Sequence, residues 1–199
     1  MPDACPAMVR RWRGSAALAL GLAAAGPLAA QSPVPDAVVR SGELSFDGHA
    51  TTGDFRGVTT TLSGRMTGGA SVAEVRGWVE APAASLRTGN GRRDRDMYRS
   101  LESDRYPTIR FDLTHVVPDS AAGDSTRVTL QGTMHVHGVS RPLQLVGVVV
   151  RQGPATRLLS RFQLDLRDYR IEGLSRFLGI LKMSPVIGVR VDVTFAPST

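Results

Sequence analysis

The feature that most constrains the fold is an alternation of apolar and polar residues that returns in many short segments. The pattern runs through residues 43–49, 55–66, 72–79, 108–117, 128–136, 143–150, 158–166 and 187–195. Successive side chains of a strand point to opposite faces, so each segment is predicted to be a half-buried β-strand. Turn signals such as Gly53-Asp54 and Gly68-Gly69 separate the segments. About eight short strands at this spacing predict an all-β sandwich or barrel rather than a parallel sheet.

One segment has the pattern of a helix instead. Asn90 is a favourable N-cap residue, and Met97 and Leu101 follow on one helical face because they lie four residues apart. The other faces mix arginines with aspartates and a glutamate within residues 92–102. This mixture predicts a solvated helix that lies across the strands rather than an arm that binds nucleic acid.

Closing the strands into a barrel would remove their free edges, which otherwise invite aggregation. The expected fold class is therefore an all-β, eight-stranded antiparallel β-barrel with one helix packed on it. A barrel of about eight strands has an interior just wide enough for side chains or for one small ligand. The apolar faces of the strands must then line the lumen, which is either packed solid or an apolar tunnel.

The candidate ligand-binding residues are the large apolar side chains on the predicted inward faces of the strands and on the apolar face of the helix. They are Leu44, Phe46, Phe55, Met66, Met97, Leu101, Phe111, Leu113, Met134, Phe162, Leu164 and Val191. For each of them, plain core packing is the alternative to contact with a ligand.

The N-terminus has the order of a secretory signal. Arginines at residues 10, 11 and 13 precede an apolar stretch over 16–25, and the small pair Ala29-Ala30 follows. We expect residues 1–30 to be removed by cleavage near Ala30 and the protein to be exported to the periplasm. The apolar stretch is shorter than the ~20 residues that span a bilayer, so stable membrane insertion is not expected. Residues 31–37, with two prolines, predict a flexible lead-in to a barrel domain over 38–197.

Nucleic-acid binding and metal binding are not expected. The formal net charge is +6, but beyond the N-terminus the arginines are interspersed with acidic residues. His135 and His137 would share a strand face and could ligate a metal ion if His49 or His115 joined them. We expect them instead to be turn and surface histidines.

Catalysis is not expected either. The aspartate pairs 94/96 and 165/168 could serve acid–base chemistry, but no nucleophile motif lies near them. The chain has no Gly-x-Ser-x-Gly elbow and no phosphate loop. Asp94, beside arginines, is expected to cap a helix or to form an ion pair. The expectation is a protein that is not an enzyme and that needs no cofactor or metal.

Several motifs, in order along the chain, resemble the YceI-like family. They are Ser45-Phe46-Asp47-x-His49, Gly53-Asp54-Phe55, Ala84-Ser85-Leu86-x-Thr88-x-Asn90, Arg93-Asp94-x-x-Met97, Tyr106-Pro107-x-Ile109-x-Phe111, the segment 132–142, Asp168-Tyr169-x-Ile171, the segment 179–183 and the final valine strand. The resemblance implies a lipocalin-like extended barrel and, as in some members, a polyisoprenoid or isoprenoid-tailed quinone in an elongated pore. This chain departs from the family by lacking a phenylalanine pair before Tyr106 and by having Arg170 where glycine is usual.

Three functions stay open at this point. The favoured one is a periplasmic binding protein that holds a long apolar ligand, an isoprenoid lipid or quinone, in the lumen. The alternative is a non-catalytic, partner-binding barrel with a packed lumen and an arginine-rich docking helix. The third is a hydrolase or isomerase with a carboxylate at the tunnel mouth. The oligomeric state is open, and a homodimer is one option.

Overall fold

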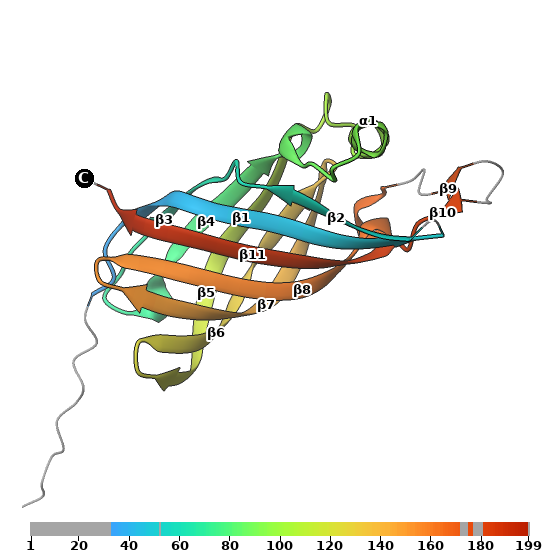
Figure 1. The fold of residues 1–199 in the computed structure, drawn as a ribbon. Coiled ribbons are helices and arrows are strands. Elements are labelled where there is room, and N and C mark those ends of the chain that lie inside the picture. Colours follow the sequence, from blue (N-terminus) through green and yellow to red (C-terminus); the bar gives the residue numbers. More distant parts are fainter. Residues whose placement is uncertain (1–32, 52, 172–174, 177–180, 199) are drawn as a thin grey trace, which may run out of the picture. The chain divides into compact units, whose positions relative to one another are not determined.

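The strands of the chain form a closed antiparallel barrel. The computed structural model describes residues 33–51, 53–171, 175–176 and 181–198. The strands are β1 (Ala37–Ala50), β2 (Gly53–Thr59), β3 (Ser63–Thr67), β4 (Arg76–Pro82), β5 (Thr108–Ala122), β6 (Ser125–Val136), β7 (Val139–Gln152), β8 (Ala155–Asp165) and β11 (Val186–Pro197). Among the described residues, eight of these strands close the barrel in the order β11-β8-β7-β6-β5-β4-β3-β1 (Figure 1). The predicted fold class is confirmed.

Strand β1 closes the ring because it pairs on both of its edges. On one edge it runs beside β11 from Ala37, opposite Pro197, to Asp47, opposite Gly188. On the other edge its first residues pair with β3 and its residues from Leu44 onward pair with β2. The two-residue strands β9 (Ser175–Arg176) and β10 (Leu181–Lys182) pair with each other.

Two predicted strands are interrupted, and both predictions of a continuous strand are wrong. Residues 55–66 divide into β2 and β3, since the Thr59 hydroxyl accepts a hydrogen bond from the Thr61 backbone N–H at 3.0 Å. Residues 72–79 begin with a 3₁₀ turn, η1 (Val72–Glu74), before β4. The Glu74 carboxylate accepts from the Ala70 N–H at 3.0 Å. Such local side-chain acceptors compete with the strand ladder for backbone donors.

The predicted helix is α1 (Gly91–Ser100), and its predicted N-cap is confirmed. The Asn90 side-chain oxygen accepts from the N–H groups of Arg92 and Arg93 at 3.0 and 3.1 Å. The helix packs on the barrel through Met97 and the following Leu101 (Figure 1). None of the helices in the described part of the chain has the length and apolarity needed to cross a membrane.

The described part of the predicted lead-in is held by hydrogen bonds. Val34 exchanges two backbone hydrogen bonds with Gly69, at 2.8 and 3.0 Å. The Asp36 carboxylate accepts from the Gly68 N–H at 2.8 Å. Residues 33–36 are therefore attached to the loop between β3 and η1. The predicted signal segment and its cleavage site lie outside the described residues.

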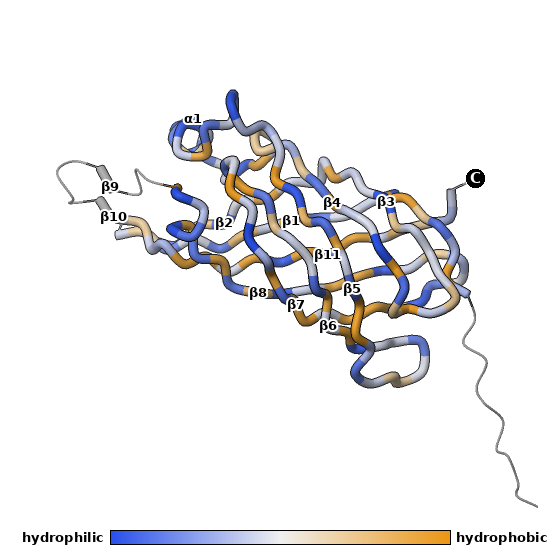
Figure 2. Tube along the Cα trace, turned by 180° about the vertical axis from the view of Figure 1, so that it is seen from behind, coloured by the Kyte–Doolittle hydropathy of each residue, from blue (hydrophilic) through white to orange (hydrophobic). Residues whose placement is uncertain are grey.

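The buried side chains inside the barrel form apolar clusters, and apolar and polar residues alternate along the strands in Figure 2. One cluster of buried residues surrounds Phe46, Leu86 and Tyr169 at the α1 end. A second surrounds Val128 and Leu130 near the β5–β6 turn. The alternation predicted from the sequence thus places the apolar face of each strand inside.

Candidate ligand-binding site

A cavity of about 790 Å³ occupies the interior of the barrel. Its wall includes Met97 and Leu101 at one end, and Gly123 and Pro154, in the β5–β6 and β7–β8 turns, at the other. The antiparallel strands carry these two sets of residues to opposite ends of the barrel. The cavity is therefore elongated, and its volume is in the usual range of ~300–1,000 Å³ for small-molecule sites.

Every candidate ligand-binding residue predicted from the sequence lies on the wall of this cavity. They come from β1 (Leu44, Phe46), β2 (Phe55), β3 (Met66), α1 and its end (Met97, Leu101), β5 (Phe111, Leu113), β6 (Met134), β8 (Phe162, Leu164) and β11 (Val191). Phe111 and Phe162 pack against both buried clusters, so they connect the two ends. Contact between these residues and a ligand stays a prediction.

Sequence reasoning missed several other wall residues. Leu130, Val189 and Val193 line the cavity as well, and they share strand and parity with the predicted Met134 and Val191. Extending the alternation along each strand would have found them. The polar wall residues Arg93 and Ser100 lie four residues before and three residues after Met97, so the helical spacing would have placed them on the same face of α1.

The α1 end of the cavity contains an ordered aromatic pair. The rings of Phe46 and Phe55 meet edge to face, with centroids 6.1 Å apart. Glycines make room for both rings: a Cβ on Gly57 would lie 2.1 Å from the Phe46 ring, and one on Gly48 would lie 2.6 Å from the Phe55 ring. The guanidinium carbon of Arg93 lies 4.4 Å from the centroid of Phe55. This geometry places a cation on the aromatic part of the cavity wall.

Three aspartates of the predicted pairs have structural partners. Asp94 is buried and accepts hydrogen bonds from the backbone N–H and the hydroxyl of Thr88, at 2.8 and 2.6 Å. Asp165 accepts from Arg167, and these hydrogen bonds lower the pKa of the carboxyl. Asp96 forms an ion pair with Arg99. Asp165 thus caps the 3₁₀ turn η3 (Leu166–Tyr169), and Asp96 is part of an ion pair. The expectation that Asp94 caps a helix or forms an ion pair is wrong, because its described hydrogen bonds come from Thr88.

The two histidines that were predicted to share a strand face lie in different elements and contact different residues. His137 lies in the turn after β6 with a φ of 52°, and its Nδ1 is 3.0 Å from the Tyr169 carbonyl oxygen. His135 lies on β6, and its Nε2 is 3.0 Å from Asp112. The expectation that both lie on one strand is wrong, because β6 ends at Val136 and His137 belongs to the following turn. In the described part of the chain, no three His, Cys, Asp or Glu side chains lie together as a metal site would require.

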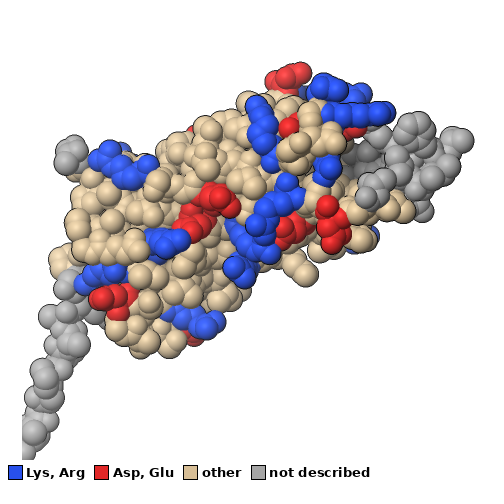
Figure 3. Space-filling model, in the orientation of Figure 1, with Lys and Arg blue, Asp and Glu red and all other residues tan. Residues whose placement is uncertain are grey.

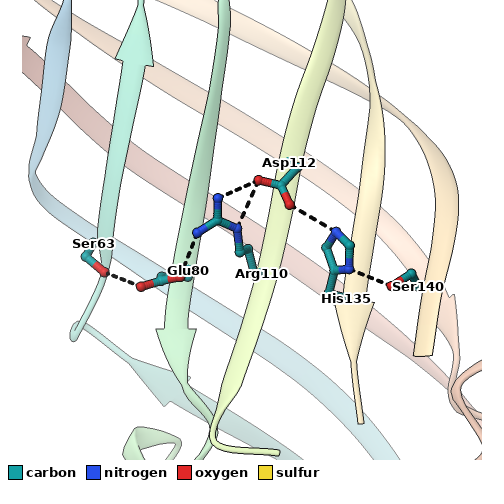
Figure 4. Close-up of polar contacts among 6 residues, drawn as sticks. All are labelled: Ser63, Glu80, Arg110, Asp112, His135 and Ser140. Carbon is teal, nitrogen blue, oxygen red and sulfur yellow. Dashed lines mark hydrogen bonds and ion pairs between the residues drawn. The ribbon is translucent and has the colours of Figure 1, made fainter. Parts of the chain in front are cut away.

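A polar network crosses the strands from β3 to β7 (Figure 4). Arg110 donates to Asp112 at 2.7 and 2.9 Å and to Glu80 at 3.2 Å. His135 joins Asp112 to the Ser140 hydroxyl, which lies 2.7 Å from its Nδ1. The hydrogen bond from Arg110 is the largest cause that lowers the pKa of Asp112.

This network has the residue types of a Ser-His-Asp triad but not its setting. Asp112, His135 and Ser140 are not among the residues that line the cavity. The Asp112 carboxylate also forms an ion pair with Arg110, so it is not a partner of the histidine alone, as the aspartate of a triad would be. The contacts therefore act as cross-strand pairs, which stabilise antiparallel neighbours.

The fold and the cavity place this chain among the antiparallel β-barrels with an elongated internal cavity. Residues 38–196 match the family model of the YceI-like domain, and the chain therefore belongs to the YceI-like family. The comparison with curated protein sequences found no significant match.

Solved structures share the fold at low sequence identity. BcnA of Burkholderia cenocepacia is 12% identical, with a TM-score of 0.65 over 77% of this chain and 95% of that one. A polyisoprenoid binding domain from Saccharophagus degradans is 18% identical, with a TM-score of 0.68 over 83% of this chain and 99% of that one. A YceI protein of Campylobacter jejuni is 15% identical, with a TM-score of 0.51 over 62% and 73% of the two chains.

Proposed function

We propose that this protein is a periplasmic binding protein that holds an isoprenoid-tailed lipid or quinone in the lumen of its barrel. The observation that carries the proposal is the elongated cavity of about 790 Å³, whose wall is mostly apolar side chains. The solved domain from Saccharophagus degradans with a similar fold is described as polyisoprenoid-binding, which supports the same ligand class. The basic and then apolar N-terminal segment supports export.

The physical basis is the removal of an apolar chain from water. Each buried methylene contributes roughly 0.8 kcal/mol, so a five-carbon isoprene unit contributes about 3–4 kcal/mol before costs. Ordering a flexible tail and immobilising the ligand offset much of this gain. Affinity should therefore rise with tail length until the cavity is full.

The cavity also bears on the alternative of a partner-binding barrel with a packed lumen. That alternative requires side chains to fill the interior, whereas Phe111, Phe162 and Val191 are only partly buried although they point into the barrel. Their open surface faces the cavity. A binding role without catalysis fits this mostly apolar wall, and three carboxylates of the wall are held by basic partners: Asp54 by His49, Glu80 by Arg110 and Asp96 by Arg99.

The test is a titration of delipidated protein with prenyl alcohols of two to eight isoprene units, in which chain length is the variable. We expect affinity to increase with each early unit and then to level off. Phe162→Ala should weaken the binding of long alcohols. The matched control is Val146→Ala, because Val146 is 52% exposed and lies on the outer face of β7.

Absence of binding for every chain length would overturn the proposal, provided that mass spectrometry of freshly purified protein also shows no co-purified lipid. Equal loss of affinity in the Phe162 and Val146 variants would argue that the ligand binds outside the lumen.

A further inference from the structure

The outer face of the barrel contains an apolar patch that the ligand cavity does not use. Val117 on β5 and Val146 on β7 are 38% and 52% exposed, and both lie opposite Thr129 of β6, so they form one row across three strands. Val148 and Leu159 pair with each other at the next outward position along β7 and β8. Contiguous exposed apolar side chains on a protein surface commonly mark an interaction site.

Strand parity separates this patch from the lumen. Leu145 and Leu158, which neighbour patch residues along β7 and β8, line the cavity, whereas Val146 and Leu159 do not. Successive side chains of a strand point to opposite faces, so the patch faces outward. Whatever covers the patch is therefore a partner of the barrel surface, distinct from the ligand in the lumen.

Two exposed arginines border the patch. Arg127 on β6 lies opposite Val148, and Arg161 lies two residues after Leu159 on β8. Both have the outward parity of their strands. Among the residues that the structure describes, no carboxylate lies within ion-pair distance of either guanidinium. The edge of the patch thus has basic groups whose charge the described part of the chain does not balance.

A further excess of positive charge lies beside Arg161. This residue is paired directly with Arg190 of β11, and like charges on opposite residues of antiparallel strands repel each other. Asp47 lies 2.7 Å from Arg190, but the same carboxylate also accepts from Arg56 at 2.9 Å. Figure 3 shows basic side chains gathered over the middle of β11 and its neighbours. An anionic partner would relieve this repulsion.

An anionic lipid surface fits this arrangement better than a second copy of the chain does. A two-fold interface uses the same patch of both copies, so it would bring a second set of the same arginines to the contact. A bilayer instead accepts aliphatic side chains at the boundary of its acyl region and offers phosphate oxygens at head-group depth. Arginine reaches such oxygens with its charged end while its aliphatic stem stays against apolar surface.

We propose that the outer face of β5–β8 docks on the surface of a bilayer that contains anionic phospholipids. Val117, Val146 and Val148 contact the acyl boundary, and Arg127 and Arg161 bind lipid phosphates. The contact is peripheral and lies outside the lumen, so it goes beyond the proposed ligand binding.

The experiment measures co-sedimentation of the purified protein with two kinds of vesicle. One is phosphatidylcholine alone, and the other contains phosphatidylglycerol as about one third of its lipid. We expect binding to the anionic vesicles to be about 10-fold tighter and to weaken as sodium chloride screens the contact. Arg127→Gln and Arg161→Gln should each weaken it about fivefold, since one basic group near such a surface is worth that much. Val146→Ser should weaken it about three- to tenfold through lost apolar burial.

Arg92→Gln is the matched control for charge, because Arg92 is exposed on α1, outside this face. Val186→Ser is the matched control for apolar contact, because Val186 is as exposed as Val117 but lies opposite Asp165 at the start of β11. Both variants should bind the anionic vesicles as wild type does, and thermal unfolding of every variant verifies the fold.

Equal binding of wild-type protein to the two kinds of vesicle would overturn the inference. Unchanged binding in both arginine variants of the patch, or equal losses in the controls, would overturn it as well. A dimer in sedimentation velocity that Val146→Ser abolishes, without vesicle binding, would assign the patch to a second copy instead. Titration with prenyl alcohols tests the lumen separately in each case, so the proposed function stands or fails by itself.

Discussion

A substitution at Val191 can shorten the cavity from inside without changing the outer surface of the barrel. It lies on β11 opposite Leu44 and Ser160, and it lines the cavity while remaining partly exposed to it. Val193 lies two residues further on the same face and also borders the cavity, but its side chain is 0% exposed, so no open space adjoins it. The substitutions Val191→Phe and Val193→Phe therefore add the same atoms to an open and to a filled position.

The expected magnitudes follow from the space at each position. Phenylalanine adds about four carbon atoms to valine, close to the five of one isoprene unit. Excluding one isoprene unit from the cavity loses about 3–4 kcal/mol of burial free energy. The excluded unit no longer has to be ordered, which offsets roughly half of this loss. We expect Val191→Phe to weaken binding of a long prenyl compound about 10- to 30-fold. The folded state should change by less than about 1 kcal/mol, since the new ring enters open space.

Val193→Phe should behave differently. Adding methylenes to a filled core forces neighbours to move and typically costs about 1–3 kcal/mol of stability. Urea unfolding measures the two stabilities, and titration with prenyl alcohols of increasing length measures the binding of each variant. In the Val191 variant, affinity should level off about one isoprene unit earlier than in wild type.

The reasoning would be refuted if Val191→Phe destabilised the protein as much as Val193→Phe and left the length dependence of binding unchanged. That result would mean that the lumen around Val191 is packed and that the ligand does not reach it.

Three further predictions concern the fold. Replacing Arg170 by glycine should raise stability by about 0.5–1 kcal/mol and Tm by about 1–4 °C, because Arg170 has a left-handed φ of 55°; an unchanged Tm would contradict this. Asn90→Ala should cost about 1 kcal/mol in urea unfolding, since it removes the acceptor for two N–H groups of α1. The Arg110 contact lowers the pKa of Asp112, so its stabilisation is present above about pH 4 and is lost as the pH falls further. Asp112→Asn should therefore reduce the acid sensitivity of unfolding, by less than about 1 kcal/mol because the pair is partly exposed.

Much of the strand pattern and of the cavity wall could be predicted from the sequence. In a strand the face of each side chain follows from its parity, which is a local property. The inward position of Phe46, Phe111 and Phe162 could therefore be predicted without knowing their neighbours. The N-cap at Asn90 was predictable for the same reason, since its acceptor acts within three residues.

Local competition between side chains and the backbone was not visible in the pattern. The hydrogen bonds at the break after Thr59 and at the turn at Glu74 are local, but the tertiary structure decides whether the backbone forms them or continues the strand ladder. The end of β6 before His137 belongs to the same class, because it depends on a left-handed turn.

The sequence by itself determined which residues of this chain turn inward and where its helix begins, because strand parity and N-capping act over a few residues. The tertiary structure alone decided that β1 pairs with β11, that the interior stays open between Phe111 and Phe162, and that Arg93 lies on Phe55. Each of these depends on distances between residues far apart in the chain, and no short pattern of residue types specifies such distances.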